Sequence, residues 1–307
     1  MPLLAKFLFV VAFCLSAWLS SPPLALALGL SLALTLGNPF PEFTRTWAKW
    51  LLQISVVGLG FGMNLGQVLR AGRSGFLYTM IGISFAIALG MLLGKYLAVD
   101  RNPALLISVG TGICGGSAIA AVGPVIEANE HDMAVSLGTV FILNAVGLFI
   151  FPAIGHRFHL SQEQFGLWAA LAIHDTSSVV GAAAKYGTIA LGIATTVKLT
   201  RALWIVPVTL GAAALNKRQA RLQIPWFILF FLLAALARSS SPPVLMNTYS
   251  GLVAAAKVGL AITLFLIGSS LSREAIKEVG VRPLVQGVVL WIVVATGSMW
   301  LVLRLVR

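Results

Sequence analysis

Charged residues are scarce in this sequence of 307 residues: Asp, Glu, Lys and Arg make up 10% of it, and only 9 residues are acidic. Soluble domains carry about 25% charged residues, so this chain lacks the polar surface that a soluble fold needs. Hydrophobic residues make up 59% of the chain, and its mean hydropathy is +0.96. Apolar runs that can cross a hydrocarbon core about 30 Å thick follow one another almost without interruption. The composition excludes a cytosolic enzyme and a disordered tail, and it predicts an all-α polytopic membrane protein.

Cysteine is nearly absent, which excludes a disulfide-stapled secreted domain. Cys14 and Cys114 lie far apart in apolar segments and form no metal-ligand spacing. The net charge of +12 would suggest nucleic acid in a soluble protein. Here most basic residues stand singly or in small groups between apolar runs, as membrane topology signals do. We therefore expect a lipid bilayer around the chain, and no nucleic acid, cofactor or metal.

Eleven segments are candidate membrane spans. They cover residues near 3–19, 24–37, 48–68, 75–97, 103–126, 133–153, 165–184, 188–214, 223–237, 247–270 and 284–304. The first segment has a basic residue, Lys6, before its apolar run, as signal peptides do, but further spans directly after Pro22 and Pro23 favour a retained helix. Because the loops are short, residues 1–307 are predicted to form one integral membrane domain, with an N-terminal helical pair at about 1–37 and a transport core at 48–307.

The distribution of Lys and Arg predicts the orientation. With eleven spans, loops on the N-terminal side hold twelve of these residues and loops on the other side hold six. The positive-inside rule then places the N-terminus in the cytoplasm and the acidic loop 127–132 on the outer face. Basic residues of the N-terminal side include Lys95, Arg101, Arg157, Lys217, Arg218, Arg221, Arg273 and Lys277.

A weak internal similarity suggests a duplicated architecture. Residues 61–65 (FGMNL) and 267–271 (IGSSL) share a Gly-x-x-Leu pattern, and each precedes a polar stretch and a long apolar helix. The two copies lie on predicted spans of opposite direction, as an inverted-topology repeat requires. Such a short match also arises by chance in glycine-rich helices.

The segment 103–126 contains a cluster of glycines near the predicted middle of the bilayer. Four glycines within residues 110–116 weaken a helix by about 1 kcal/mol each relative to alanine. We expect a broken helix with Ser117 capping its second half, and free backbone N–H groups that bind an anion. The candidate binding residues are Gly112, Cys114, Gly115, Gly116 and Ser117. The alternative is that the small residues only allow close helix packing.

A second polar interruption lies in the segment 165–184, where five polar residues follow one another from His174 to Ser178. Asp175 is the single carboxylate predicted deep in the membrane, where it costs about 2.5–3.5 kcal/mol on insertion scales. Thr176, Ser177 and Ser178 are predicted to cap a second half-helix and to bind substrate. His174 titrates near neutral pH, so His174 and Asp175 are the candidates for proton coupling. Alternatively, this run is a surface loop.

Basic and amide side chains also fall at predicted membrane depth. Lys198 and Arg201 are three residues apart and therefore share one helix face. With Lys257 they outnumber Asp175, and this excess positive charge favours an anion. The alternative for Lys198 and Arg201 is snorkelling to the surface. Asn64 and Asn144 are further intramembrane polar residues, of a kind that more often bonds a neighbouring helix than a ligand.

Four sequence stretches resemble the YeiH-type family of bacterial inner-membrane proteins, which are described as sulfate exporters. They are GTGICGGSAIAAVGPVIEA (110–128), FGLWAALAIHDTSSVVGAAAKYG (165–187), VKLTR (197–201) and LFLIGSSLSREAIKEVGVRPL (264–284). The likeness extends from about Lys49 to the end. It implies a fold like that of cation-proton antiporters and anion transporters, with inverted repeats and broken helices, in a multi-pass inner-membrane protein.

Together these features predict a secondary transporter of a small inorganic or sulfur-containing anion such as sulfate, coupled to protons. Gly115, Gly116 and the residues around Ser177 would hold the anion, with Lys198 or Arg201 supplying charge. The alternative is a cation- or proton-coupled antiporter in which Asp175 binds the ion. We do not expect an enzyme, because no phosphate loop or HExxH motif occurs and adjacent residues such as His174, Asp175 and Ser177 cannot form a catalytic triad. Transporters of this fold often form homodimers.

Overall fold

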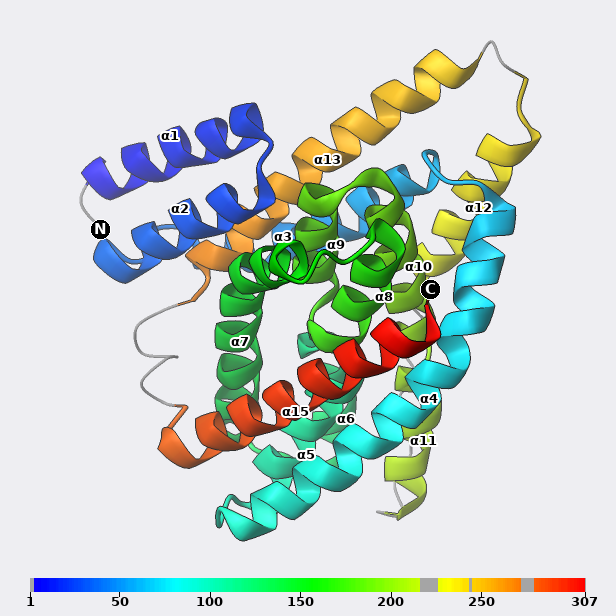
Figure 1. The fold of residues 1–307 in the computed structure, drawn as a ribbon. Coiled ribbons are helices and arrows are strands. Elements are labelled where there is room, and N and C mark those ends of the chain that lie inside the picture. Colours follow the sequence, from blue (N-terminus) through cyan, green and yellow to red (C-terminus); the bar gives the residue numbers. More distant parts are fainter. Residues whose placement is uncertain (1–2, 216–225, 243–244, 272–278, 307) are drawn as a thin grey trace. The chain divides into compact units, whose positions relative to one another are not determined.

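The computed structural model describes residues 3–215, 226–242, 245–271 and 279–306 (Figure 1). Its regular elements in these ranges are all helices, which confirms the all-α fold class. The helices form two compact units: unit 1 within residues 1–70 and 226–273, and unit 2 within residues 71–225 and 274–307. Six basic residues used to predict the orientation lie outside the described residues: Lys217, Arg218, Arg221, Arg273, Lys277 and Arg307.

Five stretches of the described chain are long and apolar enough to cross a membrane: Tyr78–Tyr96, Glu130–Arg157, Thr188–Ala214, Met246–Ser269 and Val281–Arg304. Shorter apolar helices cover Leu3–Leu19, Pro22–Thr35 and Trp226–Ser240. These helices lie close to the predicted spans, so the chain is a multi-pass membrane protein.

Unit 1 is a bundle of ordinary packed helices. It contains α1 (Leu3–Leu19), α2 (Pro22–Thr35), α3 (Pro41–Gly60), α12 (Trp226–Ser240) and α13 (Met246–Ser269), and α13 packs against α1, α2 and α3. A Cβ atom on Gly29 would lie 2.2 Å from the carbonyl oxygen of Phe265, and one on Gly268 would lie 2.5 Å from that of Leu26. Glycine therefore allows the backbones of α2 and α13 to touch, as small residues do between membrane helices.

Asn64 is not at mid-span, contrary to the sequence prediction. Helix α3 ends at Gly60, and residues 61–64 form a turn before α4 (Leu65–Tyr96). The Asn64 side chain is exposed, and its Oδ1 accepts a hydrogen bond from the Gly66 backbone N–H at 2.9 Å. The predicted span 48–68 thus ends early, because the turn with Gly62 and Asn64 closes α3.

Unit 2 is arranged around one long helix, α7 (Glu130–Arg157). Helices α5, α6, α9 and α15 pack against α7, and α10 packs against both α8 and α9. With 28 residues, α7 is about 42 Å long. Besides α7 and most of α4, unit 2 contains α5 (Arg101–Gly112), α6 (Gly116–Val122), the short 3-10 helix η1 (Gly123–Ile126), α8 (Gln162–Ala172), α9 (Thr176–Tyr186), α10 (Thr188–Ala202), α11 (Ile205–Leu215) and α15 (Val281–Leu305).

Residues 101–126 form a re-entrant hairpin, here called hairpin 1. Its arms are α5 and α6 with η1, and a Cβ atom on Gly110 of α5 would lie 3.0 Å from Ile119 of α6. At the base, Asn102 Nδ2 donates to Asp132 Oδ2 at 3.2 Å, so the chain returns to the end of unit 2 where it entered. At the tip, Gly115 has a φ of +67°, a conformation that glycine adopts without steric cost.

Residues 162–186 form a second re-entrant hairpin, hairpin 2. A continuous helix of this length would be about 37 Å long, yet its two ends meet. The Tyr186 hydroxyl donates to the carbonyl oxygen of Leu160 at 2.7 Å, and the rings of Phe165 and Tyr186 stack at 3.7 Å. Both lie beside the C-terminal end of α7, where a Cβ atom on Gly155 would lie 2.6 Å from Phe165. In Figure 1, α5 and α6 lie toward one end of α7, and α8 and α9 lie toward the other.

The sequence therefore predicted both helix breaks but not the path of the chain after them. Segments 103–126 and 165–184 were each expected to cross the membrane, and each instead turns back. The loop 127–132 consequently lies at the same end of unit 2 as Asn102, as their hydrogen bond requires, and not on the opposite side as predicted. A broken span and a re-entrant hairpin have the same length and hydrophobicity, so composition alone does not distinguish them.

Candidate functional site

The tips of the two hairpins meet beside the middle of α7. Asn144 is halfway along α7, and its Oδ1 accepts hydrogen bonds from the backbone N–H groups of His174 at 3.1 Å and Asp175 at 3.0 Å. A Cβ atom on Gly115 would lie 3.4 Å from the backbone of Asp175. We call this region, formed by residues 111–116, 173–178, Asn144, Lys198 and Arg201, the tip site. The tip site contains both helix interruptions that the sequence predicted, the glycine cluster and the polar run.

Arg201 joins the two hairpins through their backbones. Its Nε donates to the carbonyl oxygen of Gly112 and its Nη2 to that of Thr111 at 3.3 Å, both at the C-terminal end of α5. Its Nη1 donates to the carbonyl oxygen of Leu171 at 2.5 Å, near the end of α8. A cation is stabilised at helix C-termini, where carbonyl groups lack intrahelical partners. Arg201 thus holds the first arms of both hairpins together.

Lys198 lies one turn before Arg201 on the same face of α10, as predicted. Its Nζ donates to the carbonyl oxygens of Ile173 at 2.7 Å and Ala170 at 3.5 Å. Lys198 is 0% and Arg201 1% exposed, so neither side chain snorkels to a surface. Both cations are already engaged with backbone oxygens, which the sequence did not indicate.

Asp175 is the N-cap of α9, which corrects the prediction that the following hydroxyl residues cap this helix. Its Oδ2 accepts hydrogen bonds from the backbone N–H of Ser177 at 3.0 Å and from the Ser177 hydroxyl. Thr176, Ser177 and Ser178 are instead the buried first residues of α9. Asp is a strong N-cap because its carboxylate accepts the free N–H groups of the first turn.

The predicted cap of the second arm of hairpin 1 is also wrong. The N-cap of α6 is Gly115, without a side-chain hydrogen bond, and Ser117 is the second residue of α6 and is exposed. Cys114 is buried at the tip. Gly116 faces α7, since a Cβ atom there would lie 3.1 Å from the ring of Phe141. Of the tip glycines, Gly115 is therefore the one that faces hairpin 2.

Several buried polar atoms of the tip site have no hydrogen-bond partner among the described residues. They are both ring nitrogens of His174, the Nδ2 of Asn144 and the hydroxyl of Thr111. His174 is 1% and Asn144 4% exposed. Buried polar groups are nearly always paired, so these atoms mark a region adapted to bind something polar. The prediction that Asn144 bonds a neighbouring element is confirmed for its oxygen, but its free amide was missed.

The formal charge of the tip site is +1. Lys198 and Arg201 contribute two positive charges and Asp175 one negative charge, with His174 neutral. Lys257, which the sequence grouped with these cations, is a partly buried residue of α13 in unit 1. It is therefore not one of the residues that form the tip site.

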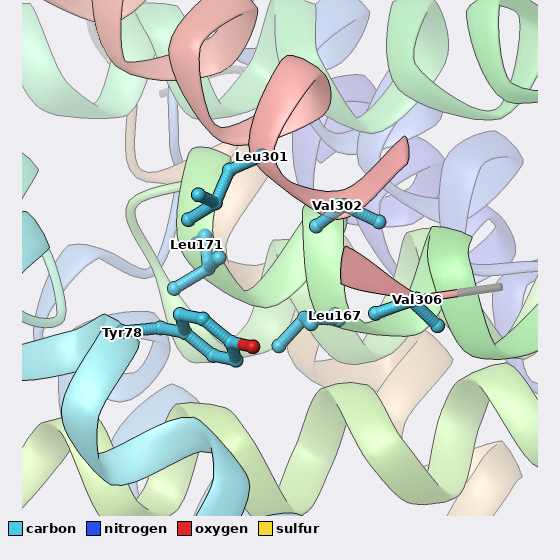
Figure 2. Close-up of a pocket in the computed structure, with 6 residues that line it drawn as sticks. All are labelled: Tyr78, Leu167, Leu171, Leu301, Val302 and Val306. Carbon is cyan, nitrogen blue, oxygen red and sulfur yellow. The ribbon is translucent and has the colours of Figure 1, made fainter. Parts of the chain in front are cut away.

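A separate apolar depression lies between α4, α8 and α15 (Figure 2). Its lining is aliphatic apart from the ring of Tyr78, whose hydroxyl points toward Leu167 in Figure 2. Without a charged or amide side chain in its lining, the depression is unsuited to an ion. It is lined by Tyr78, Leu167, Leu171, Leu301, Val302 and Val306.

Comparisons with known proteins agree with a bacterial membrane protein family. Residues 1–287 match the family model described as "Conserved hypothetical protein 698". A "UPF0324 membrane protein" of Bacteroides thetaiotaomicron is 52% identical over 289 residues, which cover 92% of this chain and 86% of the relative. Its counterpart in Bdellovibrio bacteriovorus is 50% identical over 309 residues, covering 98% and 94%.

No solved structure matches the chain. The two relatives' names describe membrane proteins and specify no substrate. They support the membrane family that the sequence stretches resemble, whereas sulfate export remains a proposal. On the extent of these matches, the chain belongs to the family of conserved hypothetical protein 698 and is a homologue of the UPF0324 membrane proteins, and it is a multi-pass bacterial membrane protein.

Proposed function

We propose that this protein is a secondary transporter that carries a small anion, with sulfate or another sulfur-containing anion as the first candidate, through the tip site. The observation that carries the proposal is the meeting of two opposed re-entrant hairpins around buried charges at the middle of α7. Non-helical backbone at membrane depth is tolerated where it lines a cavity or is covered by protein. Ionisable residues at such depth typically mark a transport path.

The charge of the tip site supports an anion as cargo. A buried formal charge of +1 in low dielectric attracts a negative ion and repels a positive one. The unpaired Nδ2 of Asn144 is a pure hydrogen-bond donor, which also suits a negatively charged oxygen. The resemblance to the YeiH-type family adds sulfate to the list of anions to test first.

Proton coupling through His174 and Asp175 is part of the proposal. Asp175 is a partly exposed carboxylate whose Oδ2 accepts from the Ser177 backbone N–H, and we propose it as the carrier of the coupled proton. The same residue carries the second candidate function, a cation- or proton-coupled antiporter in which the Asp175 carboxylate binds the ion. We further propose transport and not catalysis, because in the described site neither ring nitrogen of His174 forms the hydrogen bond with the Ser177 hydroxyl that a nucleophile–base pair needs. A cytoplasmic N-terminus and a homodimer complete the working hypothesis.

The test is flux in proteoliposomes with radiolabelled sulfate, sulfite and a sulfonate, each with and without a pH gradient. We expect uptake of at least one of them, and enhancement by the gradient. Failure of all three, with transport of Na⁺ or another cation, would contradict the anion proposal.

Asp175→Asn separates the two candidate functions, because Asn retains the N-cap of α9 but neither binds a cation nor exchanges a proton. Anion exchange that persists without the pH effect supports the first function, whereas loss of all substrate binding supports the second. Glu163→Gln is the matched control, since Glu163 is an exposed carboxylate at the base of hairpin 2. Its flux should equal that of the unaltered protein.

A further inference from the structure

We infer that Asn144 and His174 bind the transported anion directly, and that the anion is an oxyanion and not a halide. This inference rests on the proposed function and assigns its ligands. Sequence reasoning gave the role of ligand to the tip glycines, the hydroxyl residues of α9 and the two cations. In the structure, Lys198 and Arg201 instead donate to backbone carbonyl oxygens, and the donors without a partner among the described residues belong to other side chains.

The carboxamide of Asn144 is held in one orientation. Its Oδ1 accepts two backbone N–H groups at once, from His174 and Asp175. Because a carboxamide is planar, fixing the oxygen also fixes the Nδ2 at the same depth, beside the tip of hairpin 2. Both of its N–H donors are buried without a partner in the described chain. The side chain thus presents preoriented donors at the centre of unit 2.

The imidazole of His174 adds a second unpaired group at the same tip. It lies edge-on to the ring of Trp291, 6.2 Å between centroids, and neither of its nitrogens has a partner among the described residues. The indole N–H of Trp291 donates to the carbonyl oxygen of Ala172 at 3.0 Å, so it is not available as a donor to the imidazole of His174. A neutral imidazole offers one donor and one acceptor.

These donors come from different elements, Asn144 from α7 and His174 from hairpin 2. A ligand that satisfies both needs acceptor atoms in more than one direction. An oxyanion such as sulfate has several oxygens and meets this requirement, whereas a halide is a single spherical acceptor. A site whose buried donors bind a ligand oxygen also binds much more weakly any ligand that leaves those donors without a hydrogen bond.

The sharpest test is Asn144→Asp. The aspartate has the same shape and still accepts the N–H groups of His174 and Asp175, but it replaces the N–H donors with an oxygen that repels an anion. We expect uptake of radiolabelled sulfate to fall by about 100-fold, while the thermal unfolding temperature of the detergent-purified protein stays within a few degrees of the original. Thr139→Val is the matched control on α7, because the Thr139 hydroxyl donates to the Val135 carbonyl of its own helix at 2.8 Å and has no other hydrogen-bond partner among the described residues. This control should transport normally.

His174→Phe provides independent evidence, since it retains an aromatic ring against Trp291 but removes both nitrogens. We expect the KM for sulfate to rise by about 10-fold, with partial recovery in His174→Gln. Chloride should not compete with sulfate uptake at equal concentration. Sulfate uptake by Asn144→Asp and His174→Phe equal to that of the unaltered protein would overturn the ligand assignment while leaving the transporter intact. Absence of anion uptake by the unaltered protein would instead refute the proposed function.

Discussion

Buried polar groups are hydrogen-bonded differently in the two units of this protein. In unit 1, buried hydroxyls bond to carbonyl groups of their own helix: Ser16 to Ala12, Thr263 to Gly259 and Ser269 to Leu266, each at 2.8 Å. In unit 2, two buried cations donate to carbonyl groups at the ends of other helices. All the buried side-chain nitrogen and oxygen atoms without a hydrogen-bond partner in the described chain also belong to unit 2. Local bonding suits a structural bundle, whereas unpaired donors suit a binding site.

Glycine also has a different role in each unit. The glycines of α2 and α13 in unit 1 remove side chains where two helix backbones touch. Gly115 in unit 2 instead takes a left-handed backbone conformation at a hairpin tip. We infer that unit 1 is the structural part of the protein and unit 2 carries its chemistry, and the following variants test that division.

The largest effect is expected for Arg201→Gln in unit 2. Glutamine has too few donors for the carbonyl groups of Thr111, Gly112 and Leu171, and unpaired buried acceptors are costly, so we expect a loss of about 4 kcal/mol in the free energy of unfolding. Thermal unfolding in detergent measures this loss. Lys257→Gln in unit 1 is the control and should have little effect, because Lys257 is only partly buried. Equal unfolding temperatures of the two variants would contradict the division.

Gly268→Val in unit 1 is expected to have the next largest effect. Its side chain would collide with the backbone of α2 at Leu26 and Leu30, and overpacking of this kind costs about 3 kcal/mol. Flux per folded molecule should remain normal, since the tip site is in unit 2. The control is Gly251→Val on the same helix, where nothing lies within 4 Å of the added carbon. Loss of flux from a fully stable Gly268→Val protein would place function in unit 1.

Gly115→Ala and Gly116→Ala distinguish the two tip glycines. Gly115 has φ +67° and ψ −129°, where alanine costs about 1–3 kcal/mol, and the added methyl group would lie against Asp175. We expect about a 10-fold loss of sulfate flux, because 1.4 kcal/mol at the site is a tenfold effect. Alanine at Gly116 contacts Phe141 of α7 and should retain flux. The sequence had assigned both glycines to the anion, so equal losses in the two variants would restore that assignment.

The smallest effects compare two buried threonines. Thr263→Val in unit 1 removes a hydroxyl bonded within its own helix and should change the free energy of unfolding by about 0.5 kcal/mol or less. Thr111→Val in unit 2 removes a buried hydroxyl without a described partner, which should stabilise the protein by about 1 kcal/mol. Chemical denaturation in detergent resolves the sign of each change. A destabilised Thr111→Val would indicate that this hydroxyl is paired.

The sequence by itself determined the features that depend on neighbouring residues. Apolar run lengths predicted the multi-pass helical fold, and the glycines at 110–116 and the polar run at 174–178 predicted both helix breaks. The spacing of Lys198 and Arg201 predicted their common face. These features follow from helix periodicity and from the local cost of polar groups in an apolar segment.

Only the tertiary structure decided what the breaks and charges do. Whether a broken helix continues or turns back depends on contacts at its base, such as those of Asn102 with Asp132 and of Tyr186 with Leu160. The carbonyl groups that accept hydrogen bonds from Arg201 are distant from Arg201 in the sequence, and the N–H groups that donate to Asn144 are distant from Asn144. Backbone N–H and C=O groups are chemically alike in nearly every residue. A pattern of side chains therefore does not reveal which backbone groups will form hydrogen bonds with a buried cation or amide.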